Sequence, residues 1–218
     1  LLLVQHGARL EARDSLGDTP LSCAAFQLQT GACRELVALG ASLSARSEAG
    51  LTPLEVAAVT DDSGDCVRAL LQLRPDIPAG QEVYMAAFHG RLGAAKALLE
   101  AGCDVTGGIA QAGLHGQQPL HLAAASTEPH AAEMVQMLLE AGAPLSAVDG
   151  AGNTALHMAA FRAAAPQVLQ ILIQAGADVN ARGFDGLTPA QLAARVGHPE
   201  VARLLLRAAG KVGEVHSS

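Results

Sequence analysis

Histidine is the first residue type in this chain to consider for catalysis, because its ring can exchange a proton or bind a metal near neutral pH. His121 and His157 stand at the same place in two similar segments, residues 118–124 and 154–160. In four further copies of the segment other residues take that place, namely Ser22, Glu55, Tyr84 and Gln191. A required catalytic group would not allow that exchange, so we expect a structural role for both histidines.

The other histidines and the cysteines show no spacing typical of a metal or nucleophile site. The histidines lie in separate segments and are expected to be exposed: His89, His115, His130 and His198. Cys23 is expected to be a small core residue. The other cysteines have no neighbouring histidine or basic pair in sequence to activate a thiol: Cys33, Cys66 and Cys103.

Sequence motifs of the common enzyme classes are absent from the chain. It contains no G-x-x-x-x-G-K-[ST], no G-x-S-x-G and no H-E-x-x-H, which would indicate phosphate binding, a nucleophile elbow or a zinc protease. We therefore predict that this protein is not an enzyme and needs no metal and no cofactor.

The composition favours a helical, folded chain. Of 218 residues 50% are hydrophobic but only 2% are aromatic. Disorder requires low hydrophobicity and high charge, and a β-sandwich or barrel would need more β-branched and aromatic residues. No apolar run reaches the roughly 18 residues that span a bilayer. The net charge of −7 provides no basic footprint for nucleic acid or anionic lipid, so we expect neither nucleic-acid binding nor membrane insertion.

The use of cysteine indicates the compartment. The four cysteines lie far apart with no C-x-x-C pair, which argues against a disulfide-stapled domain or a zinc module. We expect an intracellular, cytoplasmic setting, with the nucleus left open. Residues 1–7 are too short and unflanked for a signal peptide. The chain has no initiating Met, and we expect it to be cut from something longer.

One segment of seven residues recurs along the chain at intervals of 29–37 residues. It reads Thr-Pro-Leu-x-x-Ala-Ala in its fullest form. Its copies stand at residues 19–25, 52–58, 118–124, 154–160 and 188–194, with a degenerate copy at 81–87. A second segment trails most copies and is fullest at residues 174–180, Gln-Ala-Gly-Ala-Asp-Val-Asn. Internal periods of this length are typical of stacked repeat architectures.

Each repeated unit predicts two short helices. The opening threonine can cap the first helix through its hydroxyl, and the proline after it suits the first helical position. Apolar residues at i, i+3 and i+4, such as Leu169, Leu172 and Ile173, predict the second helix. Glycines stand where a left-handed residue would end that helix: Gly40, Gly102, Gly142 and Gly176. Neither helix can bury its apolar face alone, so the units must stack.

These segments resemble the ankyrin repeat family. The resemblance rests on the Thr-Pro-Leu-His-x-Ala and Gly-Ala-Asp-Val-Asn patterns and covers about residues 1–209. It implies an all-α solenoid of stacked helix pairs with hairpin-like finger loops, in which His121 and His157 tie neighbouring loops together by hydrogen bonds. We expect a single ankyrin-repeat domain at 1–209 and a C-terminal tail at 210–218. The domain would comprise a partial repeat at 1–13 and repeats at about 14–46, 47–79, 80–111, 112–148, 149–181 and 182–209.

Three stretches depart from the repeat pattern. Residues 74–78 replace the Gly-Ala turn of the second unit and predict a short or absent finger. Residues 106–115 lengthen a finger, and residues 126–130 lengthen a helix–helix turn. Such insertions fall on loops, where they either contact a partner or reflect drift.

The resemblance implies a protein or peptide partner, held by a concave groove and by the fingers. In the family the residue after the Ala-Ala pair and the one following it face the groove; here these are Phe26, Gln27, Phe88, His89, Phe161 and Arg162. The candidates at the finger tips are Leu16, Phe184 and Asp185. A few exposed aromatics often carry most of an interface's energy. The alternative is that these rings pack against adjacent helices and expose little.

Two further features concern the partner and a modification. Arg13, Arg46 and Arg182 precede the finger tips at equivalent places, and arginine suits contact with carboxylates and aromatic rings. They either contact the partner or are solvated charges beside finger carboxylates. The segment ending at Asn180 resembles the one that asparaginyl hydroxylases modify in ankyrin arrays. The alternative role of Asn180 is to hydrogen-bond its own turn.

Together these features predict a monomeric scaffold that binds a partner protein or peptide along its groove and fingers. The alternative is a recruiting domain of a larger enzyme, channel or ubiquitin-ligase adaptor whose active part lies outside this chain. A third reading is that the groove masks another segment of the same protein.

Overall fold

The computed structural model describes residues 9–73, 80–107 and 116–215, with side chains up to residue 210. The chain forms two compact units, Leu1–Asp104 and Val105–Ser218, which we call unit 1 and unit 2. The sequence predicted a single domain over 1–209. The division between the units falls inside the repeat predicted at 80–111, directly after its second helix.

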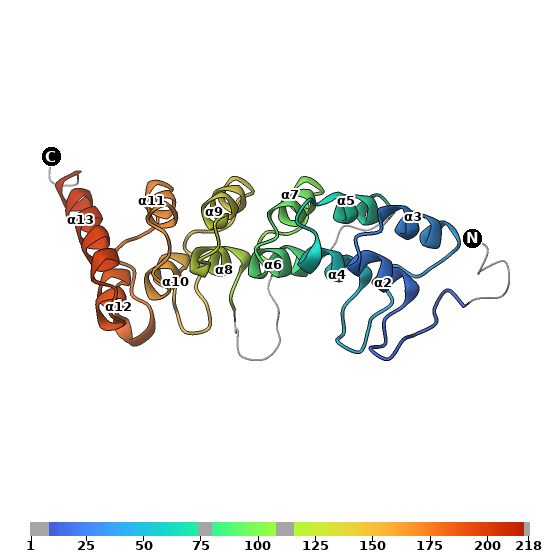
Figure 1. Ribbon diagram of the computed structural model, residues 1–218. Coiled ribbons are helices and arrows are strands. Elements are labelled where there is room, and N and C mark those ends of the chain that lie inside the picture. Colours follow the sequence, from blue (N-terminus) through green and yellow to red (C-terminus); the bar gives the residue numbers. More distant parts are fainter. Residues whose placement is uncertain (1–8, 74–79, 108–115, 216–218) are drawn as a thin grey trace. The chain divides into compact units, whose positions relative to one another are not determined.

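Unit 1 contains helix pairs stacked in two layers (Figure 1). Its first helices are α2 (Pro20–Phe26), α4 (Pro53–Thr60) and α6 (Gln81–Phe88). Its second helices are α3 (Thr30–Ala38), α5 (Asp65–Gln72) and α7 (Leu92–Glu100). Helix α4 packs between α2 and α6, and α5 packs between α3 and α7, so each layer is a row of neighbouring helices.

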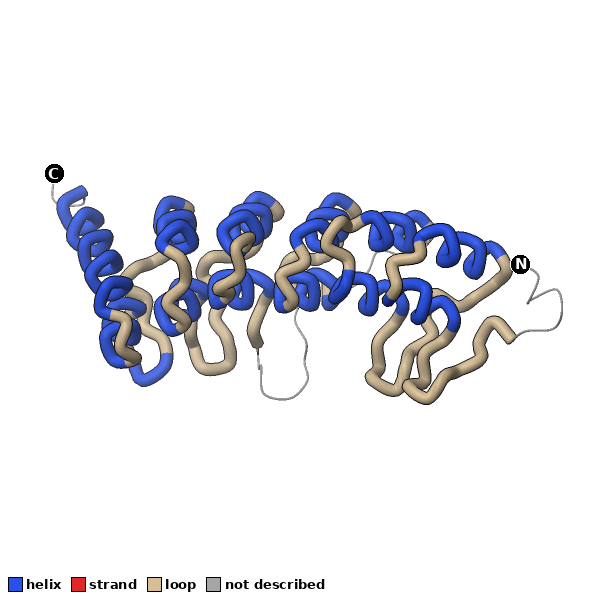
Figure 2. The backbone as a smooth tube through the Cα atoms, in the orientation of Figure 1, coloured by secondary structure: helices blue, strands red, loops and turns tan. Residues whose placement is uncertain are grey.

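Unit 2 repeats this arrangement. Its first helices are α8 (Pro119–Ala125), α10 (Ala155–Phe161) and α12 (Pro189–Arg195). Its second helices are α9 (Ala131–Glu140), α11 (Pro166–Gln174) and α13 (Pro199–Val215), and the short 3₁₀ turn η1 (Phe184–Gly186) precedes α12. Figure 2 shows helices joined by loops, with no strand in the part of the chain that the structure describes. The predicted all-α repeat architecture is confirmed.

The first helices begin as the sequence predicts. The Thr52 hydroxyl accepts the Glu55 N–H at 3.3 Å, and the Glu55 carboxylate accepts the Thr52 N–H at 2.6 Å. This reciprocal capping satisfies two donors that a helix start leaves without partners. Thr19 caps α2, and Thr188 caps α12.

The core of each unit consists of small residues in the first helices and leucines in the second. The Ala-Ala pairs are buried in every copy except the last, where Ala194 is exposed. Alanine lets adjacent first helices approach closely, and α12 has no first helix after it in unit 2. Leucines at one repeated place in the second helices have no more than 1% exposure: Leu70, Leu98, Leu138, Leu172 and Leu205. Burying each side chain contributes about 2 kcal/mol.

The finger loops are tight turns with a repeated hydrogen-bond pattern. In the second finger Ser47 N–H donates to Leu51 O at 3.0 Å, and Gly50 N–H donates to Ser47 O at 2.9 Å. The fingers that begin at Asp14, Asp149 and Gly183 form the same two bonds. Glu48 N–H also donates to Leu16 O, which joins the first two fingers. Gly17 has φ +71°, and a Cβ there would lie 2.8 Å from Glu48 N, so only glycine fits.

Several expectations need correction. Helix α13 continues through residues 210–215, where the sequence analysis expected a tail. Cys23 is half-buried beside Asp14, not in the core, and His198 is half-buried, not exposed. The predictions for residues 74–78, for most of the 106–115 insertion and for His115 lie outside the described residues. The turn at 126–130 is indeed longer than the turn between α2 and α3.

Candidate protein-binding surfaces

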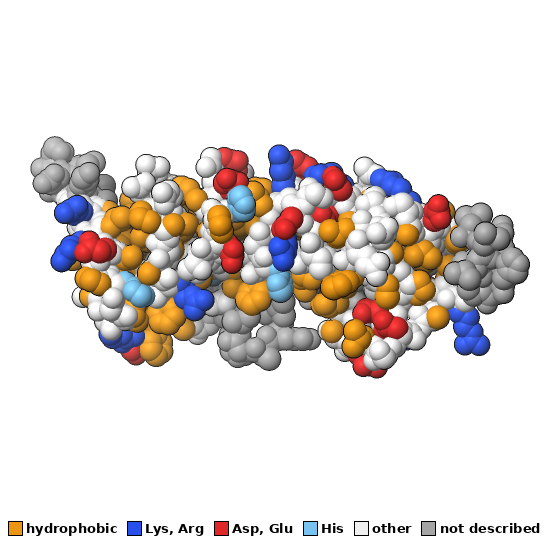
Figure 3. Space-filling view, viewed as in Figure 1, with side chains coloured by type: hydrophobic (Ala, Val, Ile, Leu, Met, Phe, Trp, Pro, Cys, Tyr) orange, Lys and Arg blue, Asp and Glu red, His pale blue; other side chains and the backbone are white. Residues whose placement is uncertain are grey.

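All four phenylalanines of the chain are exposed. Phe26, Phe88 and Phe161 are the last residues of their helices and are 64%, 56% and 46% exposed. Phe184, at the start of η1, is 52% exposed. These rings therefore do not fill the core between first helices, which was the alternative. Hydrophobic side chains are interspersed with charged ones on the face shown in Figure 3.

In unit 1 the exposed rings flank a smaller apolar residue. Phe26 ends α2 and Phe88 ends α6, while α4 between them places half-buried Val59 at the equivalent position. The Phe88 ring meets the His89 ring edge-on, with centroids 5.1 Å apart. Burial, together with the charge of Arg91, lowers the pKa of His89, so this ring is neutral at pH 7. Gln27, which follows Phe26, is exposed.

The finger tips add two more apolar side chains, one in each unit. Leu16 is 65% exposed in the first finger of unit 1. In unit 2 the Phe184 N–H donates to Asn153 Oδ1 at 3.0 Å, which fixes the turn while the ring stays exposed. Asp185 pairs with Arg195 at 2.8 Å and so braces η1 against α12. Arg162 is exposed at the end of α10.

The three finger arginines bind backbone carbonyls. Arg13, Arg46 and Arg182 each donate from Nη1 to the carbonyl of the glycine four residues ahead, across their own finger turn. Arg13 also reaches Arg46 O at 2.6 Å, and Arg46 also reaches the buried Glu55 carboxylate at 3.2 Å. These guanidinium groups therefore brace the fingers, which neither sequence interpretation anticipated. The three arginine side chains are exposed, so they are also accessible to a partner.

The two repeated histidines have the structural role that the sequence predicted. Both rings are 1% exposed. His157 Nδ1 accepts the N–H of Thr154, so Nε2 carries the proton and donates to Leu187 O at 3.1 Å. His121 similarly accepts the Gln118 N–H and lies 3.1 Å from Ala147 O and Asn153 O. Burial lowers the pKa of both rings, so each ring is a neutral link from a helix start to the next finger.

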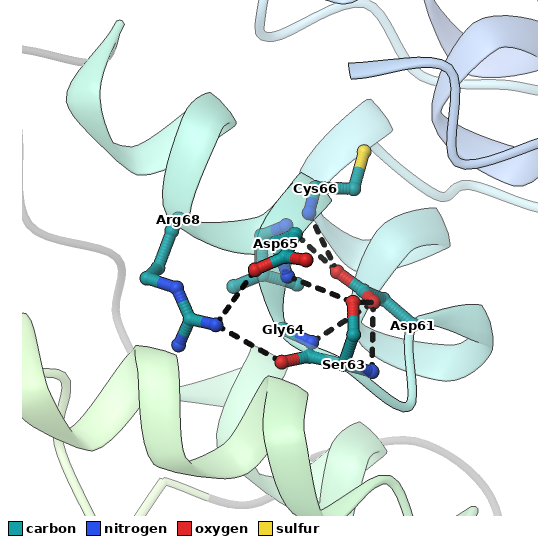
Figure 4. A network of polar contacts seen from close by, with 7 residues as sticks. Asp61, Ser63, Gly64, Asp65, Cys66 and Arg68 are labelled. Carbon is teal, nitrogen blue, oxygen red and sulfur yellow. Dashed lines mark hydrogen bonds and ion pairs between the residues drawn. The ribbon is translucent and has the colours of Figure 1, made fainter.

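A buried carboxylate in unit 1 is a feature that the sequence analysis missed. Asp61 is fully buried between α4 and α5 (Figure 4). It accepts the N–H groups of Gly64, Cys66 and Val67 at 2.8–3.1 Å, and both the N–H and the hydroxyl of Ser63. A carboxylate suits this place because the first N–H groups of a helix lack intrahelical partners and carry partial positive charge.

The loop held by Asp61 is also tied to the next helix pair. Arg91 donates to Val59 O at 2.9 Å and pairs with Asp62 at 3.0 Å. A Cβ on Gly93 would lie 2.2 Å from Asp62 O, so the loop and α7 touch backbone to backbone. The signal in the sequence was Asp61-Asp62-Ser63-Gly64 in place of a three-residue turn. This segment occurs only once, so a comparison of the repeats with one another could not reveal it.

Three of the four cysteines are buried, and Cys23 is half-buried. Cys33 and Cys66 are buried, and their thiols contact each other. The hydrogen bond between the two thiols lowers the pKa of Cys33, and together with burial it raises the pKa of Cys66. Burial and Asp14 raise the pKa of Cys23. All four are free thiols. No group of three or more His, Cys, Asp or Glu gathers as a metal site within the described residues.

Comparison with protein families decides the classification. The family model of ankyrin repeats in three copies matches residues 1–81, 83–183 and 120–214. The chain belongs to the ankyrin repeat family. A human relative, neurogenic locus notch homolog protein 4, is 39% identical over 93 residues. That stretch is 43% of this chain and 4% of the relative, so this chain matches only a small part of that protein.

Solved ankyrin structures share the fold. The ankyrin repeat domain of human ASB11 matches with a TM-score of 0.80 and 22% identity over 95% of this chain and 90% of that one. The ankyrin repeat domain of Bcl-3, an IκB family member, matches with a TM-score of 0.75 and 29% identity over 93% and 89%. Ankyrin repeat domains generally mediate protein–protein interactions.

The ankyrin turn that ends at Asn180 is accessible. Asn180 is exposed, and its N–H donates to Asp178 Oδ1 at 2.9 Å. The turn is thus held by the aspartate and not by the asparagine side chain. Among the helices described in these two ankyrin units, none has the length and apolarity needed to cross a membrane.

Proposed function

We propose that this ankyrin repeat protein binds a protein or peptide partner through the ends of its first helices and the tips of its fingers. The observation that carries the proposal is the exposure of all four phenylalanines, between 46% and 64%, in a chain that is only 2% aromatic. A large exposed ring gains free energy when a partner covers it. Rings this exposed contribute little to packing within the chain, and binding of a partner explains why all four are placed at the surface.

The surrounding contacts support recognition by a preformed surface. The arginines and histidines hold the fingers, and Asn153 and Arg195 hold η1 in unit 2. A surface held this way loses little conformational entropy on binding. The net charge of −7 favours a protein over a nucleic acid as partner. The free thiols fit the reducing setting expected for the cytoplasm or nucleus.

A second candidate is that the array recruits partners or substrates for a larger protein. The observation that favours it is the size of the human relative, of which the matched stretch is only 4%. In that case catalysis or transport belongs to another part of the protein, and this chain supplies the binding surface. The two candidates share the same surface, so the experiment below applies to both.

We also propose Asn180 as a substrate of an asparaginyl hydroxylase, because its side chain is exposed and its turn is held by Asp178. Incubation of the chain with such an enzyme, its oxoacid co-substrate, iron and oxygen should add one oxygen atom at Asn180 by mass spectrometry. The Asn180→Ala variant is the matched control. An unchanged mass of the Asn180 peptide overturns this proposal.

The binding proposal is tested by capture with matched variants. The immobilised chain is incubated with a cell lysate, and bound proteins are quantified by mass spectrometry. The double variants Phe26→Ala with Phe88→Ala, and Phe161→Ala with Phe184→Ala, should lose partners that the wild type retains. Leu206→Ala is the control, because Leu206 is 61% exposed but lies on α13.

Thermal unfolding of each variant separates binding from folding. Truncating an exposed ring should change stability by less than about 1 kcal/mol, whereas a buried Phe→Ala costs roughly 3–5 kcal/mol. Equal loss of partners with Leu206→Ala, or unchanged capture by folded double variants, would contradict the proposed surface.

A further inference from the structure

A groove in unit 2 lies on the opposite layer from the exposed phenylalanine of α10. It has a volume of about 990 Å³ and runs between α11 and α13. Its walls include Leu169 and Ile173 of α11 and Val201, Leu204 and Ala208 of α13. The groove also includes Ala163 and Ala164, which follow Arg162, but no residue of the surface proposed above lines it. The argument for the groove does not depend on that proposal.

The groove lies where α13 packs less closely on α11 than other neighbouring second helices pack on each other. Neighbouring second helices pack side by side elsewhere within the units, as α9 does with α11. Helix α13 packs on α12 instead, through the fully buried Leu205, and extends away from α11 in Figure 1.

The floor of the groove is apolar and incompletely covered. Ile173, Val201 and Leu204 are half-buried, although the Leu172 and Leu205 side chains beside them are fully buried. Figure 3 shows hydrophobic side chains gathered over α11 at this end of unit 2. Along each helix the lining residues recur every three or four positions, so each wall is one helical face.

The charge of the groove differs from that of the chain. Helix α11 carries no charged residue, and the charged lining residues are Glu200, Arg203 and Arg207 of α13. Glu200 pairs with Arg203 at 2.6 Å. Arg207, one turn further on, forms no ion pair or hydrogen bond with any residue that the structure describes. The rim is therefore net positive, although the whole chain carries −7.

We propose that the α11–α13 groove docks an amphipathic helix of a partner protein, with leucine-like residues on one face and carboxylates beside them. The apolar residues would cover Ile173 and Leu204, and the carboxylates would pair with Arg207 and Arg203. The volume lies at the upper end of the range for single ligand sites. The two helical walls suit a third helix laid between them, a common mode of peptide recognition.

The test uses two synthetic peptides of 18 residues with the same leucines at i, i+3, i+4 and i+7. One carries glutamates on both flanks of the leucine face, and the other carries lysines at those positions. Each peptide is labelled with fluorescein and titrated with the full chain, and binding is measured by fluorescence anisotropy. We expect the glutamate peptide to bind about tenfold more tightly than the lysine peptide, because each of the two arginines can contribute up to about fivefold by pairing with a glutamate.

Variants then locate the site. The double reversal Arg203→Glu with Arg207→Glu should weaken the glutamate peptide about tenfold or more and strengthen the lysine peptide. Leu204→Ala should weaken both peptides, and circular dichroism should confirm that each variant is folded. Leu206→Ala is the matched control and should leave both affinities unchanged, because Leu206 is exposed on the same helix but does not line the groove.

Three results would overturn the proposal. The first is equal affinity of the two peptides, which leaves the arginines without a role. The second is unchanged binding in the folded double reversal. The third is a dimer of the free chain in sedimentation that Leu204→Asp dissolves, since the groove would then be occupied by a second copy.

Discussion

The two units differ at one repeated position, which links neighbouring helix pairs in unit 2 but holds other residues in unit 1. In unit 1 this position, the fourth residue of each repeated seven-residue segment, holds Ser22, Glu55 and Tyr84. In unit 2 it holds His121, His157 and Gln191. The imidazole is long enough to cap its own helix with one nitrogen and to reach the next finger with the other. The Ser22 hydroxyl contacts only the capping Thr19 hydroxyl, and the Glu55 carboxylate caps its own helix and accepts a bond from Arg46.

Unit 1 makes the missing links with charged groups elsewhere. Arg46 joins Glu55 to the finger, Arg91 joins α7 to the preceding turn, and Asp61 organises the start of α5. The repeat architecture therefore fixes where neighbouring units must be joined, but not which residue joins them. One consequence is that the units should respond differently to acid and to the loss of a single side chain.

The largest effect is expected for Asp61→Ala in unit 1. This change removes the buried carboxylate that accepts hydrogen bonds from five donor groups, four of which are backbone N–H groups. Leaving buried donors without partners should cost about 3 kcal/mol or more. Denaturant unfolding with hydrogen exchange should show the loss in α4 and α5. Asp62→Ala is the control and should cost less than about 1 kcal/mol, because its ion pair with Arg91 is exposed.

Acid should weaken unit 2 through its two imidazoles. Burial lowers the pKa of His121 and His157 in the folded state. The unfolded chain therefore binds more protons below its ordinary histidine pKa, and the free energy of unfolding falls as the pH drops below about 6.5. If folding lowers the pKa of one histidine by 1, acid removes about 1.4 kcal/mol from the free energy of unfolding.

The control for this pH dependence comes from the chain itself. In α12 the Gln191 side chain accepts the Thr188 N–H at 3.0 Å, as the histidine Nδ1 does. The double variant His121→Gln with His157→Gln should keep the caps and flatten the pH dependence of unit 2 between pH 7 and 5. An equally steep loss in the double variant would assign the effect to other groups.

A smaller effect separates two finger arginines. Arg46→Ala should destabilise unit 1 by about 1 kcal/mol, because it removes a contact with the nearly buried Glu55 as well as the finger bond. Arg182→Ala loses only the bond to Gly186 O and should cost about half as much in unit 2. Urea unfolding of the single variants measures both. Equal costs would show that the Arg46–Glu55 pair contributes nothing measurable.

The smallest effect concerns the turn between the helices of a pair. Ala163 has φ +51°, while Gly197 has φ +89° at the same place in the next unit. Alanine is strained in this region and glycine is not. Ala163→Gly should therefore stabilise unit 2 by about 0.5 kcal/mol or more, and Gly197→Ala should destabilise it by about 1 kcal/mol. Thermal unfolding that shows both changes as destabilising would contradict this explanation.

Much of the fold could be predicted from the sequence because its signals are local and repeated. Threonine and proline at the helix starts, Gly102 and Gly142 at the ends, and the buried alanine pairs lie where the pattern placed them. The histidine links were also correctly predicted. The Asp61 network was not, because it occurs once and its partners are backbone groups that carry no residue signature.

The sequence alone determined the repeat, the helix pairs, the family and the positions of the four phenylalanines. Only the tertiary structure decided that these rings are exposed, that the arginines bind finger carbonyls, and that α13 leaves a groove beside α11. The physical reason is that a repeat pattern records which residues each unit buries against its neighbours. Exposure, a bond to a backbone carbonyl and the packing of a last helix depend on what surrounds a residue, and that is fixed only when the units stack.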